Sequence, residues 1–346
     1  MKKRLILLVT LTLLITSVLS GCGESKPSIN VYNWGEYINT DVLEIFEEET
    51  GIRVIYDTYA TNEDLYVKMK QGGSSYDVVF PSDYMIERMI SEDLLSEIDL
   101  NNIPMIKGVD ERFLNLDYDL KNLYSVPYMW GTVGIIYNTS MIDRELTSWA
   151  DLWDEEFAGE IIMLNSQRDT LAVALKKLHY SMNTRSIEEL EEARDELIKQ
   201  KPIVYAYLGD EVKDVMIGGE ASIAVVWSGD AAAMIEEDSD LKYVIPEEGT
   251  NLWFDAMVVP KNAENKEAAE QFINFMTRPD IAAMNAEYIG YSSPIPEAIE
   301  LLPEEVQNSE VAYPSNEKLE NTEIFMDPKD IIGEYDRIWT EITSAQ

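Results

Sequence analysis

The 346-residue sequence contains a single cysteine, Cys22, and a single histidine, His179. One cysteine cannot form a disulfide within the chain, so the fold must be held together by its hydrophobic core. No Gly-x-Ser-x-Gly, P-loop or HExxH motif occurs. His179 falls within a helical pattern, which favours a structural or surface role. These absences argue against an enzyme, and the sequence calls for no metal and no cofactor.

Positive charge is also scarce, because 27 Lys and Arg residues stand against 65 Asp and Glu residues, which gives a formal net charge of −38. Such a surface repels the phosphates of nucleic acid, and nucleic acid is therefore excluded as a partner. It disfavours adhesion to anionic lipid headgroups in the same way. A cationic ligand suits the charge, although an acidic excess also serves solubility alone.

The apolar run from Leu5 to Leu19 is too short for a comfortable transmembrane helix. It follows three positive residues at positions 2–4, as in a secretory signal peptide. The run ends in Leu19-Ser20-Gly21-Cys22, which resembles the lipobox of bacterial lipoproteins. We therefore predict a signal peptide over 1–21, then a lipidated Cys22 and polar tether over 22–28. This anchor would hold the protein on the outer face of the cytoplasmic membrane.

The rest of the chain alternates strand-like and helical apolar patterns, which is typical of α/β domains with parallel sheets. We predict strands at 28–33, 53–59, 77–80, 133–137, 160–164, 222–226 and 251–260. We predict helices at 41–50, 63–70, 84–90, 170–179, 186–199, 231–237, 264–277, 281–288 and 329–343. Ser148 and Ser186 each begin a predicted capping box. The body of the chain is long enough for two domains.

The stretch Asn251–Pro260 combines strand-forming residues with an aromatic ring and an acid. Side chains alternate along a strand, so Trp253 and Asp255 are expected to point the same way. The indole face and the carboxylate both attract a cation. An edge strand with a packed Trp and a solvated Asp would show the same two residues, so this stretch needs support from elsewhere.

Four other predicted strands are followed by loops that carry a ring, a carboxylate or both. These loops are 34–37 (Trp-Gly-Glu-Tyr), 81–84 (Pro-Ser-Asp-Tyr), 166–169 (Ser-Gln-Arg-Asp) and 227–230 (Trp-Ser-Gly-Asp). Ligands of open parallel sheets bind outside the carboxyl ends of the strands. If the loops converge, they form an aromatic slot with several carboxylates, which suits a ligand with several ammonium groups.

At this point the chain resembles the substrate-binding proteins of bacterial spermidine/putrescine ABC transporters, from about residue 29 to the C-terminus. The stretches that carry the likeness are Tyr32-Asn33-Trp34-x-Glu36-Tyr37, Thr50-Gly51-Ile52-x-Val54-Ile55-Tyr56, Tyr76-Asp77-x-Val79, Pro127-Tyr128-x-Trp130-Gly131, Thr147-Ser148-Trp149-Ala150-Asp151-Leu152-Trp153, Trp253-x-Asp255 and Ile289-Gly290-Tyr291. The resemblance implies a binding protein that captures polyamines and delivers them to a transmembrane permease. We expect it to be a monomer. It also implies a two-lobed α/β periplasmic-binding-protein fold, type II-like, with the ligand cleft between the lobes. The first lobe would be 29–131 plus 256–300, and the second 132–255 plus 301–346.

The resemblance assigns ligand contacts position by position. The residues that match the polyamine cleft of the family are Trp34, Glu36, Tyr37, Ser82, Tyr84, Asp169, Trp227, Trp253, Asp255 and Tyr291. The chain departs from the family pattern at three places. Gly35 replaces a hydroxyl residue, the acidic segment before Arg168 is one residue shorter, and no amide lies near Phe325. These departures leave the choice between spermidine and putrescine open.

Three alternatives remain. Another organic cation, such as a quaternary ammonium compound, would need the aromatic rings but fewer carboxylates. Paired carboxylates beside Trp residues also occur in glycoside hydrolases. The 19 tyrosines would allow an iron binder, which a tyrosinate–iron colour would reveal.

Overall fold

The computed structural model describes residues 27–72 and 75–345, and the predicted signal peptide and Cys22 lie outside them. The strands are β1 (Ser28–Trp34), β2 (Arg53–Tyr59), β3 (Val78–Val79), β4 (Ser125–Asn138), β5 (Ile161–Leu164), β6 (Val204–Leu208), β7 (Ile223–Trp227), β8 (Leu241–Val244) and β9 (Leu252–Val258). The helices are α2 (Thr40–Thr50), α3 (Asn62–Gln71), α4 (Asp83–Ser91), α5 (Gln167–Lys177), α6 (Ile187–Gln200), α7 (Val212–Ile217), α8 (Ser228–Glu237), α9 (Lys266–Met276), α10 (Pro279–Ile289), α11 (Pro296–Ile299), α12 (Glu304–Gln307) and α13 (Ile332–Ser344). The predicted α/β class is confirmed.

The strands form one mixed sheet in the order β2-β1-β3-β9-β4-β7-β5-β6, with β8 also paired to β4. The prediction of parallel sheets is correct only at the two ends, where β1 pairs in parallel with β2 and β3, and β5 with β6 and β7. In the middle, β4 runs antiparallel to β9 and to β7. Two long antiparallel strands therefore join the two parallel parts.

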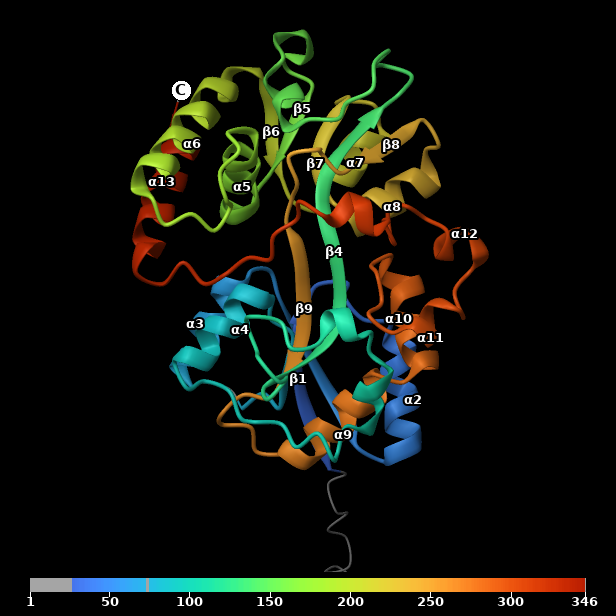
Figure 1. Cartoon of the computed structure of the whole chain (residues 1–346). Helices are drawn as coiled ribbons and strands as arrows, with labels where there is room; N and C mark the ends of the chain where they lie inside the picture. Colours follow the sequence, from blue (N-terminus) through green and yellow to red (C-terminus); the bar gives the residue numbers. More distant parts are fainter. Residues whose placement is uncertain (1–26, 73–74, 346) are drawn as a thin grey trace, which may run out of the picture.

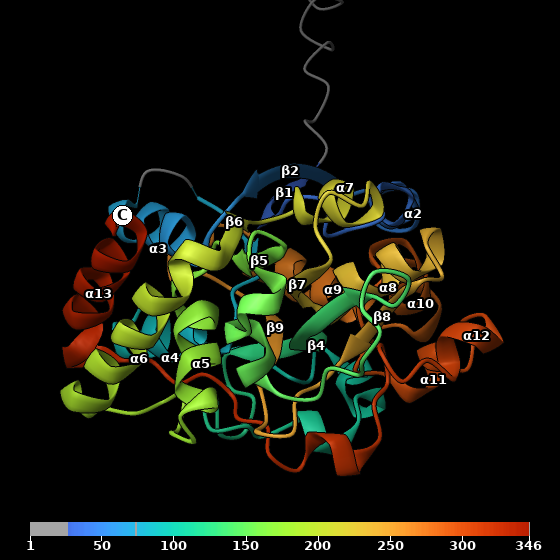
Figure 2. The ribbon, with the colours of Figure 1, turned by 90° about the horizontal axis from the view of Figure 1, so that it is seen from above.

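Figure 1 shows that the helices gather in two groups along this sheet. One group surrounds β1 and includes α2, α3, α4, α9, α10 and α11, while the other surrounds β5–β8 and includes α5, α6, α7, α8 and α13. Strands β4 and β9 run from one group to the other. The view from above shows α13 beside α6, so the C-terminal helix joins the second group (Figure 2).

Most predicted helices are confirmed within a few residues. Their ends are set by capping residues that are neighbours in the sequence and can therefore be recognised in it. Asn39 and Thr61 accept hydrogen bonds from the first turns of α2 and α3, and Gly51 and Gly72 end those helices in left-handed backbone. The capping box at Ser148 is confirmed at a 3₁₀ helix. At Ser186 only half of the box forms, because Ser186 accepts from the Glu189 backbone amide without the reciprocal bond.

Two predicted elements have the right type but the wrong bounds. The strand predicted at 133–137 begins at Ser125 and is buried along all 14 of its residues. Pro127 and Gly131 hid its first half, since proline and glycine are unusual inside a strand. Helix α5 ends at Lys177, so His179 lies beyond it, exposed, in left-handed backbone with a φ of 60°. The exposed position agrees with a surface role for His179.

Candidate ligand-binding site

Asp255 lies in β9 at the centre of a buried polar cluster. Its two carboxylate oxygens accept hydrogen bonds from the Ser82 hydroxyl at 2.6 Å and the Tyr37 hydroxyl at 2.7 Å. Burial raises the pKa of Asp255 to about 6, although the two hydrogen bonds oppose that shift. No positive side chain within 27–72 and 75–345 contributes to this pKa shift. Asp255 is therefore a buried acid, 6% exposed, without a counter-ion of its own in the described chain.

The two hydroxyl donors come from loops at the ends of β1 and β3. Ser82 occupies the N-cap position of α4 but makes no side-chain cap bond there, which leaves its hydroxyl for Asp255. Asn62 fixes Ser82 from the side: its amide nitrogen donates to Ser82 Oγ at 3.0 Å and its carbonyl accepts from the Ser82 backbone N–H at 3.2 Å. Tyr37 follows Glu36, whose left-handed φ of 51° turns the chain after β1. The loop geometry thus aims both donors at one carboxylate.

Three aromatic rings stand beside this carboxylate. Tyr291 packs edge-on against Trp253 at 5.1 Å and against Tyr37 at 5.7 Å between ring centroids. Since Tyr37 also binds Asp255, Trp253 and Asp255 lie on the same side of β9, as the strand pattern predicted. A Cβ atom at Gly131 would lie 2.5 Å from the Trp253 ring, so glycine at this point of β4 gives the indole its place.

Trp227 lies on the same face of the sheet as Trp253. It pairs with Val133 of β4, and Trp253 pairs with Gly131 two residues earlier, so the two indoles flank β4. Trp253 is only 7% exposed and belongs to the core, while Trp227 is half-buried. Trp227 is therefore the more accessible of the two rings.

Trp34 and Tyr84 adjoin the cluster through shared neighbours. The Trp34 indole donates to the Phe80 carbonyl at 2.8 Å and packs on Tyr59 at 4.7 Å. The Tyr84 hydroxyl accepts a hydrogen bond at 3.1 Å from Asn62, which also holds Ser82. Glu36 is exposed.

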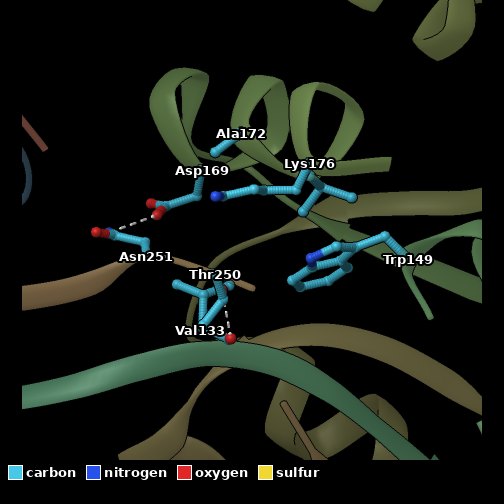
Figure 3. Close-up of a pocket in the computed structure, with 8 residues that line it drawn as sticks. Val133, Trp149, Asp169, Ala172, Lys176, Thr250 and Asn251 are labelled. Atoms are coloured by element: carbon cyan, nitrogen blue, oxygen red, sulfur yellow. Dashed lines mark hydrogen bonds between the residues drawn. The ribbon is translucent and has the colours of Figure 1, made fainter. Parts of the chain in front are cut away.

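Asp169 has hydrogen-bond partners different from those of Asp255. Its carboxylate accepts from the Ser166 hydroxyl at 2.6 Å and from the Asn251 amide at 3.3 Å. Burial raises the pKa of Asp169, opposed by these bonds and by Arg168. Figure 3 shows Asp169 and Asn251 on one side of a tight pocket and Trp149 on the opposite side.

Sequence reasoning missed one ion pair at the site. Asp230, 8% exposed at the start of α8, accepts from Lys213 at 3.2 Å and from the Tyr291 hydroxyl at 3.4 Å. The sequence pattern placed Asp230 in a candidate loop, but nothing in it pointed to Lys213, which lies on a short helix that was not predicted. The contact with Tyr291 joins Asp230 to the Asp255 cluster.

The structure thus brings together Tyr37, Ser82, Trp253, Asp255 and Tyr291 through direct contacts. Trp34, Tyr84 and Trp227 border this group, whereas Glu36 and Asp169 are not in contact with it. In the described part of the chain, no group of His, Cys, Asp and Glu side chains could hold a metal ion. Over the same residues, no helix combines the length and the apolar character that spanning a membrane requires.

Comparisons with known proteins agree on one family. The family described as bacterial extracellular solute-binding protein matches residues 41–314. The spermidine/putrescine-binding periplasmic protein of Escherichia coli is 38% identical over 302 residues, which are 87% of each chain.

Two solved structures extend the likeness to three dimensions. The spermidine/putrescine ABC transporter substrate-binding protein PotD of Streptococcus pneumoniae is 42% identical, with a TM-score of 0.82, over 92% of this chain and 98% of that one. The TpPotD lipoprotein of Treponema pallidum is 28% identical, with a TM-score of 0.84, over 91% of this chain and 99% of that one. The predicted resemblance and the predicted fold class are confirmed.

Proposed function

The chain belongs to the bacterial extracellular solute-binding proteins, and we propose that it captures putrescine or spermidine outside the cytoplasmic membrane and delivers it to an ABC permease. The observation that carries this proposal is Asp255, a buried carboxylate that has no counter-ion among the described residues and is held by two hydroxyls beside three aromatic rings. An ammonium group of a polyamine would supply the missing charge while the rings cover its methylenes. The family consists of binding proteins, so the prediction that the chain is not an enzyme is confirmed.

A primary ammonium suits Asp255 better than a quaternary one. A primary ammonium donates hydrogen bonds to the lone pairs that Ser82 and Tyr37 leave on the carboxylate, whereas a quaternary ammonium has no N–H. Asp83 and Asp169 are also buried, whereas Asp230 already has Lys213 as its counter-ion. Several buried carboxylates are more than an aromatic box for one quaternary cation requires.

Strands β4 and β9 connect the two groups of elements, and a closing motion would bring these two groups together. We assign 29–131 plus 256–300 to one lobe and 132–255 plus 301–346 to the other, so both crossing strands change lobe at the cluster. Ligand contacts to Asp255 and to rings from both lobes would favour the closed arrangement by their differential affinity for it. The protein would act as a monomer in this cycle.

Calorimetric titration of the mature protein with putrescine, spermidine and choline at pH 7 tests the proposed function. We expect saturable binding of at least one of the two polyamines and at least a hundredfold weaker binding of choline. Binding of choline alone would replace the proposal with the quaternary ammonium alternative. Failure to bind any of the three would refute both.

Lipid attachment at Cys22 is a further part of the proposal, supported by the Leu19-Ser20-Gly21-Cys22 sequence and by the lipoprotein among the structural relatives. Cys22→Ala removes the one thiol of the chain and is expected to release the protein from the membrane or to block its processing. Putrescine binding should not change, because the site lies wholly in the folded body. Membrane fractionation measures the effect, and a variant that stays membrane-bound at mature size would contradict lipidation.

The pH dependence of binding follows from Asp255. Its pKa rises from 3.8 to about 6 on folding, so its ionisation opposes folding. The free energy of unfolding of the ligand-free protein is therefore higher when Asp255 is protonated. It should fall by about 3 kcal/mol, at 1.4 kcal/mol per pKa unit, as the pH rises from about 4 through 6. An ammonium ligand needs the ionised carboxylate, so putrescine affinity should fall up to about tenfold per pH unit below pH 6. Titrations between pH 5 and 8 measure the profile, and a profile without that fall would contradict it.

A further inference from the structure

We call Tyr37, Trp253 and Tyr291, with the acids Asp255 and Asp230 that the two tyrosine hydroxyls contact, the aromatic cluster. Among the described residues, Lys213 is the one lysine that pairs with an acid of this cluster. Its ammonium lies 3.2 Å from the Asp230 carboxylate, and it is 32% exposed. Asp230 also accepts from the Tyr291 hydroxyl at 3.4 Å, and the Tyr291 ring packs on Trp253 and Tyr37. The ion pair is thus part of the wall of the proposed polyamine site.

The acids that act on Lys213 come from both groups of elements. Burial lowers the pKa of Lys213, but the charges of Asp230, Asp210 and Glu36 outweigh that effect and raise the pKa overall. Lys213 therefore stays protonated at neutral pH. Glu36 follows β1 in one group of elements, while Asp210 and Asp230 belong to the other group (Figure 1). The ammonium of Lys213 thus interacts with acids from both groups, as a ligand's ammonium bound between the lobes would.

Asp255 and Asp230 differ in whether the chain supplies a counter-ion. Both are buried acids that accept from a tyrosine hydroxyl of the cluster, at 2.7 Å from Tyr37 and at 3.4 Å from Tyr291. Asp230 has a lysine of the chain as its counter-ion, and Asp255 has none within the described residues. An ammonium group that approaches Asp255 meets no competing cation there, whereas one that approaches Asp230 has to displace Lys213.

From this contrast we infer that Lys213 is a specificity-determining residue, which fills the Asp230 position of the site with the chain's own ammonium and thereby favours a diamine over a triamine. The inference rests on the proposed function and decides between its two ligands. Putrescine has two ammonium groups and spermidine three. The third ammonium of spermidine would have to compete with Lys213, which is tethered beside Asp230 at a high effective concentration.

The test is the ratio of spermidine to putrescine affinity, measured by calorimetry at pH 7 in the wild type and in Lys213→Met. The wild type should bind putrescine more tightly than spermidine. Lys213→Met frees the Asp230 carboxylate, so spermidine affinity should rise about tenfold relative to putrescine, as for one added ammonium–carboxylate contact. In the double variant Lys213→Met/Asp230→Asn the relative gain should disappear, because the vacated carboxylate is then absent.

Lys242→Met is the matched control. It removes the same charge from the same group of elements, but Lys242 lies on β8 and pairs at 2.7 Å with the exposed Glu145, away from the aromatic cluster. The ratio of spermidine to putrescine affinity in Lys242→Met should equal that of the wild type. Melting curves show whether Lys213→Met is folded, and Lys213→Gln serves as the second variant if it is not.

The outcomes separate this inference from the function on which it rests. A wild type that binds neither polyamine overturns both. A wild type that binds polyamines, with an unchanged affinity ratio in the folded Lys213 variants, overturns the inference alone. An equal gain for both ligands, or an equal loss, also overturns it, because Lys213 would then not discriminate between them.

Discussion

Replacement of Asp255 by asparagine is expected to weaken putrescine binding by about 2–4 kcal/mol, which is about thirtyfold to a thousandfold in Kd. The substitution keeps the shape of the side chain and removes the charge that we propose to pair with the ligand's ammonium. Loss of one partner from a buried, hydrogen-bonded charge pair carries a cost of this size. Calorimetry at pH 7 measures the loss directly.

The ligand-free Asp255→Asn protein should be as stable as the wild type or more stable at pH 7. Burial of the ionised carboxylate opposes folding there, and asparagine removes that charge while its carbonyl still accepts from Ser82 or Tyr37. Stabilisation by putrescine in a melting assay should shrink with the affinity.

Asp240→Asn is the control, because Asp240 is exposed and its replacement removes one negative charge, as Asp255→Asn does. Asp255→Asn with wild-type affinity would mean that Asp255 does not contact the ligand.

Gly229→Ala is expected to weaken putrescine binding by about 2–3 kcal/mol, or about a hundredfold in Kd. A Cβ atom at Gly229 would lie 1.5 Å from the Tyr291 ring, so the ring has to leave its position. Its displacement breaks the edge-on contacts with Trp253 and Tyr37 and the hydrogen bond to Asp230. Alanine favours the helix by about 1 kcal/mol, which offsets part of the lost packing. The loss should therefore appear mainly in affinity.

Gly333→Ala is the matched helical control. Gly333 lies in α13, and a Cβ atom there has no atom within 4 Å. It should gain up to about 1 kcal/mol of stability with no change in affinity. Gly229→Ala with wild-type affinity would show that Tyr291 is not a wall of the binding site.

Local chemistry made part of this site predictable. Trp253 and Asp255 alternate on one strand, and that pattern fixes their common side whatever the strand pairs with. Ser82 and Tyr37 follow strands whose carboxyl ends are close together, so their loops reach the same carboxylate. These relations follow from the strand pattern and from the general rule for parallel sheets.

The rest depends on contacts that no local pattern encodes. Lys213 reaches Asp230 because α7 packs beside α8, and neither the short α7 nor β6 before it has a strong periodic signal. The first half of β4 was missed because Pro127 and Gly131 are unusual in a strand, whereas in the structure Gly131 leaves space for the Trp253 ring. Asp169 was expected to join the other acids, but its hydrogen bonds go to Ser166 and Asn251.

The central claim is that an ammonium group of the ligand pairs with Asp255. The most direct test is the pKa of this carboxyl group, followed by carbon-13 NMR with and without saturating putrescine, with Asp255→Asn to assign the signal. Without ligand the pKa should be about 6, the value that burial gives it. With putrescine bound it should fall well below that value, because a nearby positive charge favours the ionised form. The same pKa in both titrations would contradict the claim.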